Sequence, residues 1–195
     1  GQGHGYDYVP RLEWLKGSVV NVYFVKDEKT GFSFNSAKAT FDFSDVKNIQ
    51  NEAIGSKITG KKVILARLYW AGAIANKWHN AHDLQKRYFK DIENFQTIKF
   101  KTPKGLHTIT ATQENTKWYG SYTKDGMQFM YQASADVTDL VKASLGSSDK
   151  ERTFAAGDIK STEGDPFALK GYRDNGWSNR LFAPHYGGWA LTIVY

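Results

Sequence analysis

The last nine residues, 187–195, constrain the fold most strongly. They read Gly-Gly-Trp-Ala-Leu-Thr-Ile-Val-Tyr, a glycine turn that runs into aromatic and β-branched residues without proline or charge. A run of this kind is typical of a central strand, because both of its faces can be packed and every amide can pair with a neighbour. We therefore expect residues 189–195 to form a buried inner strand of a sheet.

A second buried inner strand is predicted at residues 62–70, which read Lys-Val-Ile-Leu-Ala-Arg-Leu-Tyr-Trp and are closed by Ala71 and Gly72. Other segments are strand-like, and several alternate apolar and polar residues with the period of two that indicates one buried face. A turn at residues 103–105 joins two of them into a hairpin. These further strand segments are residues 18–26, 32–34, 40–43, 97–101, 106–111, 127–133 and 152–159.

Helical periodicity is convincing at one place only. Leu84, Tyr88, Ile92 and Phe95 recur at helical spacing among charged residues. This spacing predicts an amphipathic helix over residues 80–95.

Three other segments carry weaker patterns. A short helical turn is expected at residues 135–141, where Asp136 or Thr138 can cap the exposed amides. Residues 160–187 form a long loop region, and loops of this length are usually functional. Residues 1–16 are expected to be an arm laid over the sheet.

The balance of strands and helix predicts the fold class. At least seven strand segments against one convincing helix favour an all-β, mainly antiparallel fold. We expect a jelly-roll-like β-sandwich in one domain over residues 1–195, with a helical insertion at residues 74–96 and long loops. A parallel sheet is disfavoured, because strands and helices do not alternate regularly along the chain.

Composition sets further limits. Hydrophobic residues make up 41% of the chain and aromatic residues 15%, which is enough to build a core without disulfide bonds. The absence of cysteine excludes disulfides, thiolate metal sites and a cysteine nucleophile. A net charge of +6 allows attraction to nucleic acid, anionic glycans or lipid headgroups, but the 26 lysines and arginines are scattered, which favours a solvated basic surface.

Four blocks of this sequence carry a resemblance. The first is Ala-Arg-Leu-Tyr-Trp-Ala-Gly at residues 66–72, and the second is Ala-Asp-Val-Thr at residues 135–138, followed by Leu140 and Val141. The third is Thr-Phe-Ala at residues 153–155 with Thr-Glu-Gly at residues 162–164, and the last is residues 188–195. Together these blocks resemble a β-rich module of large bacterial surface and adhesin-like proteins.

The resemblance covers residues 62–195, with the predicted helix inserted between its first two blocks. It implies a sandwich fold, an extracellular or cell-surface setting, and an adhesive or structural role as one part of a larger chain. It implies no catalytic residues. The partners expected are a glycan or a cell-surface protein, without a membrane span, and nucleic acid is disfavoured.

Candidate metal ligands are weak in this sequence. His79 and His82 stand three residues apart beside Asp83, but no third ligand is placed by spacing, so we expect no metal site there. Glu163, Asp165 and Asp174 could bind calcium together with backbone carbonyls, although their spacing matches no EF-hand. Solvated loop acids are the simpler interpretation.

Three functions remain open. The leading one is a non-catalytic module with its ligand-facing end at Trp78, His79, Tyr172, Asp174 and Trp177, where flat rings can stack on sugars. The second is a glycan-active enzyme that uses a carboxylate pair such as Glu163 with Asp174. The third is a nucleic-acid-binding domain that uses the basic surface and the aromatic residues.

Overall fold

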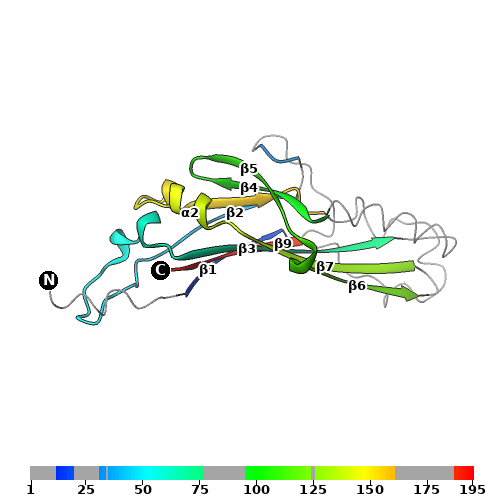
Figure 1. Cartoon of the computed structure of the whole chain (residues 1–195), viewed down its shortest axis with the longest axis horizontal. Helices are drawn as coiled ribbons and strands as arrows, with labels where there is room; N and C mark the ends of the chain where they lie inside the picture. The colour runs from blue at the N-terminus through cyan, green and yellow to red at the C-terminus, as the bar shows by residue number, and fades with distance from the viewer. Residues whose placement is uncertain (1–11, 20–30, 34, 77–94, 124–125, 161–186) are drawn as a thin grey trace.

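The computed structural model describes residues 12–19, 31–33, 35–76, 95–123, 126–160 and 187–195. Two antiparallel sheets in this part of the chain pack face to face (Figure 1). Sheet 1 has the strand order β1-β9-β3-β7-β6, and sheet 2 has the order β2-β8-β4-β5. The strands are β1 (Leu12–Val19), β2 (Ala37–Thr40), β3 (Leu65–Asn76), β4 (Thr97–Thr102), β5 (Gly105–Thr110), β6 (Thr116–Thr123), β7 (Gly126–Asp136), β8 (Thr153–Gly157) and β9 (Gly187–Val194).

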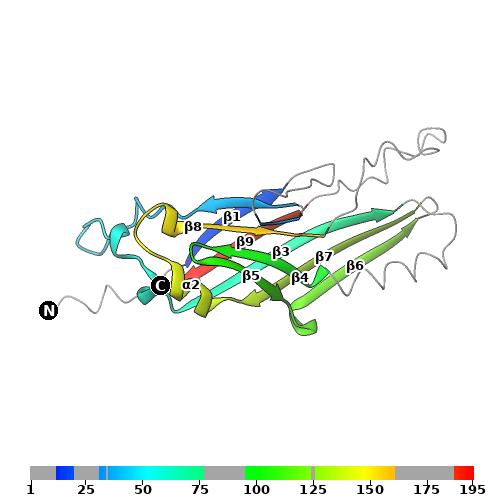
Figure 2. The same ribbon diagram turned by 90° about the horizontal axis from the view of Figure 1, so that it is seen from above.

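The order of the strands is that of a jelly roll. When the edge strand β6 is set aside, two four-stranded sheets remain, and the chain crosses between them at every step except from β4 to β5. The prediction of an antiparallel jelly-roll-like sandwich is therefore confirmed. Figures 1 and 2 show that β3, β6 and β7 extend beyond sheet 2 along the long axis of the molecule.

Helical structure among the described residues is brief. One α-helix, α2 (Thr138–Ser144), follows β7. Four short 3-10 turns are η2 (Gly55–Lys57), η3 (Gly60–Lys62), η4 (Gln113–Asn115) and η5 (Lys150–Arg152). The predicted amphipathic helix at residues 80–95 lies outside the described residues except for Phe95, so it stays a prediction.

The two strands predicted to be inner strands are inner strands. β9 lies between β1 and β3, and β3 lies between β9 and β7. Their registers place Trp70 beside Trp189 on the core face. Both indoles are almost fully buried, because the period of two turns alternate residues of β3 and β9 toward sheet 2.

Three buried rings of sheet 1 donate hydrogen bonds across the sandwich. Trp70 Nε1 donates to the carbonyl of Phe95 at 3.0 Å, and Trp189 Nε1 donates to the carbonyl of Ala37 at 3.1 Å. Tyr131 Oη donates to the carbonyl of Lys160 at 2.6 Å. Burial raises the pKa of the Tyr131 hydroxyl. These bonds fix where the chain of sheet 2 lies against sheet 1.

The short helix α2 is attached to β3 through the Asp136–Thr138 segment. The amide of Val137 donates to the carbonyl of Ala66 at 3.0 Å, and the amide of Ala66 donates to Thr138 Oγ1 at 3.0 Å. Asp136 Oδ1 accepts the Thr138 amide at 2.9 Å and the Thr138 hydroxyl at 2.6 Å. Asp136 thus satisfies the first amide of the helix, as the sequence suggested, although the N-cap position is Val137.

Several predicted boundaries differ from the structure. β3 starts at Leu65 rather than at residue 62, and it continues through Gly72 to Asn76. Gly72 does not end the strand. Its lack of a side chain serves close packing instead, because a Cβ there would lie 2.6 Å from both Tyr131 Oη and the Lys160 carbonyl oxygen.

Two short predicted strands are wrong. Phe32 and Ser33 are not in a strand, and the amide of Ser33 donates to the Asp158 carboxylate instead of to a ladder. At residues 40–43 the predicted alternation of buried and exposed side chains is present, but only Thr40 is in β2. The strand ends there because Asp42 Oδ1 accepts the amide of Ser44 and turns the chain.

At the N-terminus, the predicted arm over residues 1–16 is wrong for residues 12–16, which belong to β1 and pair with β9. β6 was not predicted, because its adjacent Trp118 and Tyr119 break the alternation that marks a strand.

The hydrogen bond of Tyr131 provides a first test. In Tyr131→Phe the ring still packs, but the Lys160 carbonyl loses its donor. We expect the free energy of unfolding to fall by about 0.5–1.5 kcal/mol, since the variant loses one hydrogen bond made by a buried ring. Urea denaturation measures the change. Tyr119→Phe, at a side chain that is 70% exposed, is the matched control and should cost less than about 0.5 kcal/mol; equal effects would contradict the assignment.

The carboxylate of Asp136 provides a second test. Hydrogen bonds from the side chain and the amide of Thr138 lower the pKa of Asp136 below its usual value. A carboxyl whose folded pKa is lowered stabilises the fold above its unfolded pKa, and this contribution is lost as the pH falls through the folded pKa. Asp136→Ala should therefore cost on the order of 1 kcal/mol at neutral pH, and the cost should shrink below about pH 4.

Urea denaturation at a series of pH values measures this difference. Asp45→Ala, which removes another exposed carboxyl, is the control for the loss of one negative charge. A cost of Asp136→Ala that stays constant down to acidic pH would show that the carboxylate is not the stabilising group.

Candidate functional site

The residues predicted to form the ligand-facing end lie outside the described part of the chain. Trp78, His79, Tyr172, Asp174 and Trp177 fall in the ranges 77–94 and 161–186, so their site stays a prediction. The same holds for the candidate calcium ligands and carboxylate pair drawn from residues 163–174. Within the described ranges, no group of three or more His, Asp or Glu side chains is placed to hold a metal ion.

A groove of about 530 Å³ lies on the outer face of sheet 2. We call it the lysine groove, because three of its lining side chains are lysines and none is acidic. The residues that line it are Phe32, Ser36, Ala37, Lys38, Lys101, Thr102, Pro103, Lys150, Thr153, Phe154 and Ala155.

Strand register brings two of these lysines to one row of the sheet. Lys38 on β2 and Lys101 on β4 both pair with Ala155 on β8. Across the sheet, this row of residues is lysine, alanine, lysine. Its two lysines are on β2 and β4, which are two strand spacings, about 10 Å, apart. Both lysines are exposed, whereas their neighbours Phe100 and Phe154 point into the core and are fully buried.

Small residues on β8 make the floor of the groove. Thr153, Ala155 and Gly157 occupy alternate positions of this strand, and the intervening Phe154 and Ala156 are fully buried in the core. The hydroxyl groups of Thr153 and Thr40 are 2.7 Å apart across the β2–β8 pair. Because β8 is paired on both sides, the floor is held at a fixed position.

Phe32 and Ser36 line the groove beside Gly157, and we call this part of the lining the end wall. The ring of Phe32 lies over Gly157 so closely that a Cβ at this glycine would be 2.4 Å from the ring. The Ser33 amide donates to Asp158 Oδ1 at 2.7 Å, and Asn35 Nδ2 donates to the carbonyl of Ile159 at 2.9 Å. The end wall is thus tied to the residues that follow β8.

The electrostatic character of the groove follows from the positions of its charges. No acidic side chain is part of the lining. Of the acidic residues next to β8, Asp158 accepts the Ser33 amide, and Glu151 Oε1 accepts the Ser148 hydroxyl at 2.8 Å. A further lysine on the same face of β4, Lys99, donates to Thr108 Oγ1 at 2.6 Å. The groove is therefore a positive surface with a neutral floor.

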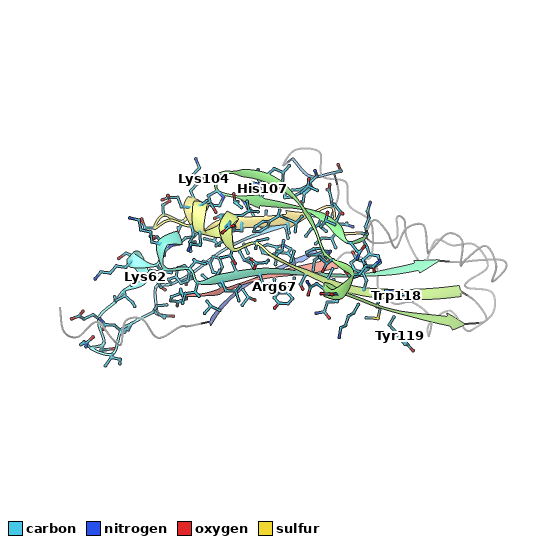
Figure 3. The ribbon with its side chains drawn as sticks, in the orientation of Figure 1. Lys62, Arg67, Lys104, His107, Trp118 and Tyr119 are labelled. Carbon is cyan, nitrogen blue, oxygen red and sulfur yellow. The ribbon has the colours of Figure 1, made fainter. Side chains whose placement is uncertain are left out.

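A second group of exposed side chains lies at the edge of sheet 1. Trp118 and Tyr119 on β6 are 49% and 70% exposed, and Met130, which pairs with Tyr119, is 40% exposed. Figure 3 shows Trp118 and Tyr119 far from Lys104 and His107, which lie on the β4–β5 hairpin of sheet 2. The edge of β6 and the lysine groove are therefore separate surfaces.

Comparison with known proteins adds no assignment. No protein-family model, no curated protein and no solved structure matches this chain. The resemblance to adhesin-like modules thus stays a prediction. None of the helices in the described ranges is long and apolar enough to cross a membrane.

Sequence reasoning missed the lysine groove, although one signal was present. Lys99 and Lys101 alternate within the predicted strand at residues 97–101 and therefore share a face. Lys38 and Lys150 are distant in sequence, and only the pairing of β2, β8 and β4 brings Lys38 and Lys101 to one row. Register thus brings together two lysines that are far apart in the sequence.

Gly157→Ala tests the packing of the end wall. The added Cβ meets the Phe32 ring and the Ser36 Cβ at less than 3.0 Å, so we expect a loss of about 1–3 kcal/mol in the free energy of unfolding. In a Phe32→Ala background the same substitution should cost measurably less, because the main obstacle is removed. A double-mutant cycle by urea denaturation measures the coupling; independent effects would show that Phe32 does not cover Gly157.

Proposed function

We propose that this chain is a non-catalytic adhesion or structural module of a bacterial surface protein, and that it binds a glycan in the lysine groove. The observation that carries the proposal is the groove itself. Its volume of about 530 Å³ falls within the roughly 300–1,000 Å³ typical of sites for small ligands. A short stretch of a sugar chain suits this volume better than the surface of a folded protein does.

The rigidity of the groove supports binding. Its floor strand β8 is paired with both β2 and β4, and its end wall is tied by hydrogen bonds of Ser33 and Asn35. A preformed site loses little conformational entropy when a ligand binds.

The chemistry of the lining favours binding over catalysis. The side chains that line the lysine groove offer ammonium and hydroxyl groups, but neither a carboxylate nor an imidazole for acid–base work. A glycosidase needs a pair of carboxylates. The alternative enzyme would have to use Glu163 and Asp174, which lie outside the described residues.

The surface location is supported by the sequence blocks at residues 66–72, 135–138 and 188–195. In the structure, two of these blocks supply inner strands and the third supplies the attachment of α2. They support the fold rather than a site, which is the arrangement expected of a module whose ligand specificity lies on its surface.

The proposal is tested by screening the purified domain on a glycan array that holds neutral and acidic glycans, followed by titration calorimetry with the best ligand. Ala155→Leu places a larger side chain on the floor between Lys38 and Lys101. We expect affinity to fall at least tenfold, because the leucine occupies space that the ligand needs, while the melting temperature stays within a few degrees.

Gln132→Leu is the matched control, since Gln132 is exposed on the outer face of sheet 1. It should leave binding unchanged. The proposal fails if no glycan on the array is retained, or if Ala155→Leu binds the selected glycan as the unmodified domain does.

A further inference from the structure

We propose that β6, at the edge of sheet 1, pairs with β6 of a second copy of this chain, so that two copies share one continuous antiparallel sheet. This surface is separate from the lysine groove and does not depend on a glycan. The observations that carry the proposal are the exposed rings of Trp118 and Tyr119 and the register that a symmetric pair of these strands would take.

Of the four strands at the sheet edges, β6 is the least protected against pairing with another strand. Proteins block such pairing with short edge strands and with charged side chains. β2 has only four residues, and β1 carries Glu13 and Lys16. β5 has six residues, and the ammonium group of Lys99 reaches it to donate to Thr108. By contrast, β6 has eight residues and a single charge, Lys117, at its second position.

The rings of β6 offer apolar surface on both faces of this edge. Tyr119 is 70% exposed on the outer face and pairs with Met130, which is 40% exposed. Trp118 is on the other face, where it pairs with the buried Tyr131, and it is still 49% exposed. A strand that pairs with β6 would cover part of both rings, and tyrosine and tryptophan supply much of the binding energy of protein interfaces.

The two-fold symmetry of such a dimer restricts its register. Residues directly opposite each other in an antiparallel pair point to the same face. A two-fold axis perpendicular to the sheet keeps the outer faces of both copies on the same side. Each residue can therefore oppose only residues an even number of positions away. The pairing must be centred on a residue such as Trp118, Tyr119 or Gly120, and not between two residues.

The register centred on Tyr119 gives the best cross-strand pairs. It places the two Tyr119 rings opposite each other, and aromatic pairs stabilise a sheet. It also places Trp118 opposite Gly120 of the second copy, where the ring covers the backbone of an edge glycine. Lys117 then opposes Ser121, so like charges do not meet. Centring on Gly120 would instead leave two glycines opposite each other, and centring on Trp118 would separate the two tyrosines.

The size and charge of this contact set its strength. One strand of eight residues from each copy is well below the roughly 20–30 residues a side of a standard interface, so we expect a weak dimer. Each copy carries a net charge of +6, and salt screens the resulting repulsion. The dimer should therefore become tighter as the salt concentration rises.

The test is sedimentation velocity on the purified chain from about 1 to about 500 µM, at about 0.05 M and about 0.5 M NaCl. Tyr119→Lys places two like charges opposite each other and should weaken the dimer at least tenfold, and Tyr119→Glu should do the same. An equimolar mixture of the two variants should dimerise again, because opposite charges then face each other. This recovery is specific to a register centred on Tyr119.

Leu106→Lys and Leu106→Glu are the matched controls, since Leu106 is 42% exposed on β5, an edge strand of sheet 2. They should leave dimerisation unchanged, and thermal melts confirm that each variant is folded. A monomer over the whole concentration range would overturn the proposal. So would a dimer that salt dissociates, a dimer lost equally in the Leu106 variants, or a loss in the Tyr119 variants that mixing does not reverse.

Discussion

The rest of this structure depends on one constraint. Buried rings of sheet 1 donate hydrogen bonds to backbone carbonyls of the facing layer. Burial of apolar surface is non-directional, so it draws the two sheets together without choosing a register. The bonds of Trp70, Trp189 and Tyr131 favour one register, because each is directional and is made only where the donor faces its carbonyl. They act at the starts of β4 and β2 and after the end of β8.

These bonds connect the core to the lysine groove. Trp189 donates to the carbonyl of Ala37, which immediately precedes Lys38. Tyr131 donates to the carbonyl of Lys160, one residue beyond Ile159, whose carbonyl accepts Asn35 of the end wall. A side chain in the core therefore fixes the backbone position next to Lys38, which lies on the outer face of sheet 2. The groove accordingly shares the rigidity of the packed core.

A buried cation holds the opposite end of β8. Arg152 precedes this strand and donates to the carbonyls of Gly146, Gly55 and Ile58, while its guanidinium carbon lies 4.7 Å from the centre of the Phe43 ring. Its Nε and Nη2 donors thus bond neutral carbonyls, and the ring face and the nearby Asp42 carboxylate, whose pKa is lowered by its hydrogen bonds to Ser44 and by Arg152, also favour the charge. The strand that forms the floor of the groove is thus anchored at both ends by contacts with the interior.

The sequence by itself determined the fold class and the inner strands, because the runs at residues 189–195 and 62–70 are rich in aromatic, leucine and β-branched residues, which is a local property of the chain. It also indicated the role of Asp136, since side-chain bonds to nearby amides are local. Only the tertiary structure decided that β3 continues through Gly72, where Tyr131 packs too closely for a side chain, and that Phe32 covers Gly157 instead of forming a strand. The lysine groove, too, was decided only by the tertiary structure. Lys38 and Lys101 share a row because both strands pair with β8, and pairing between distant segments leaves no mark in a local pattern.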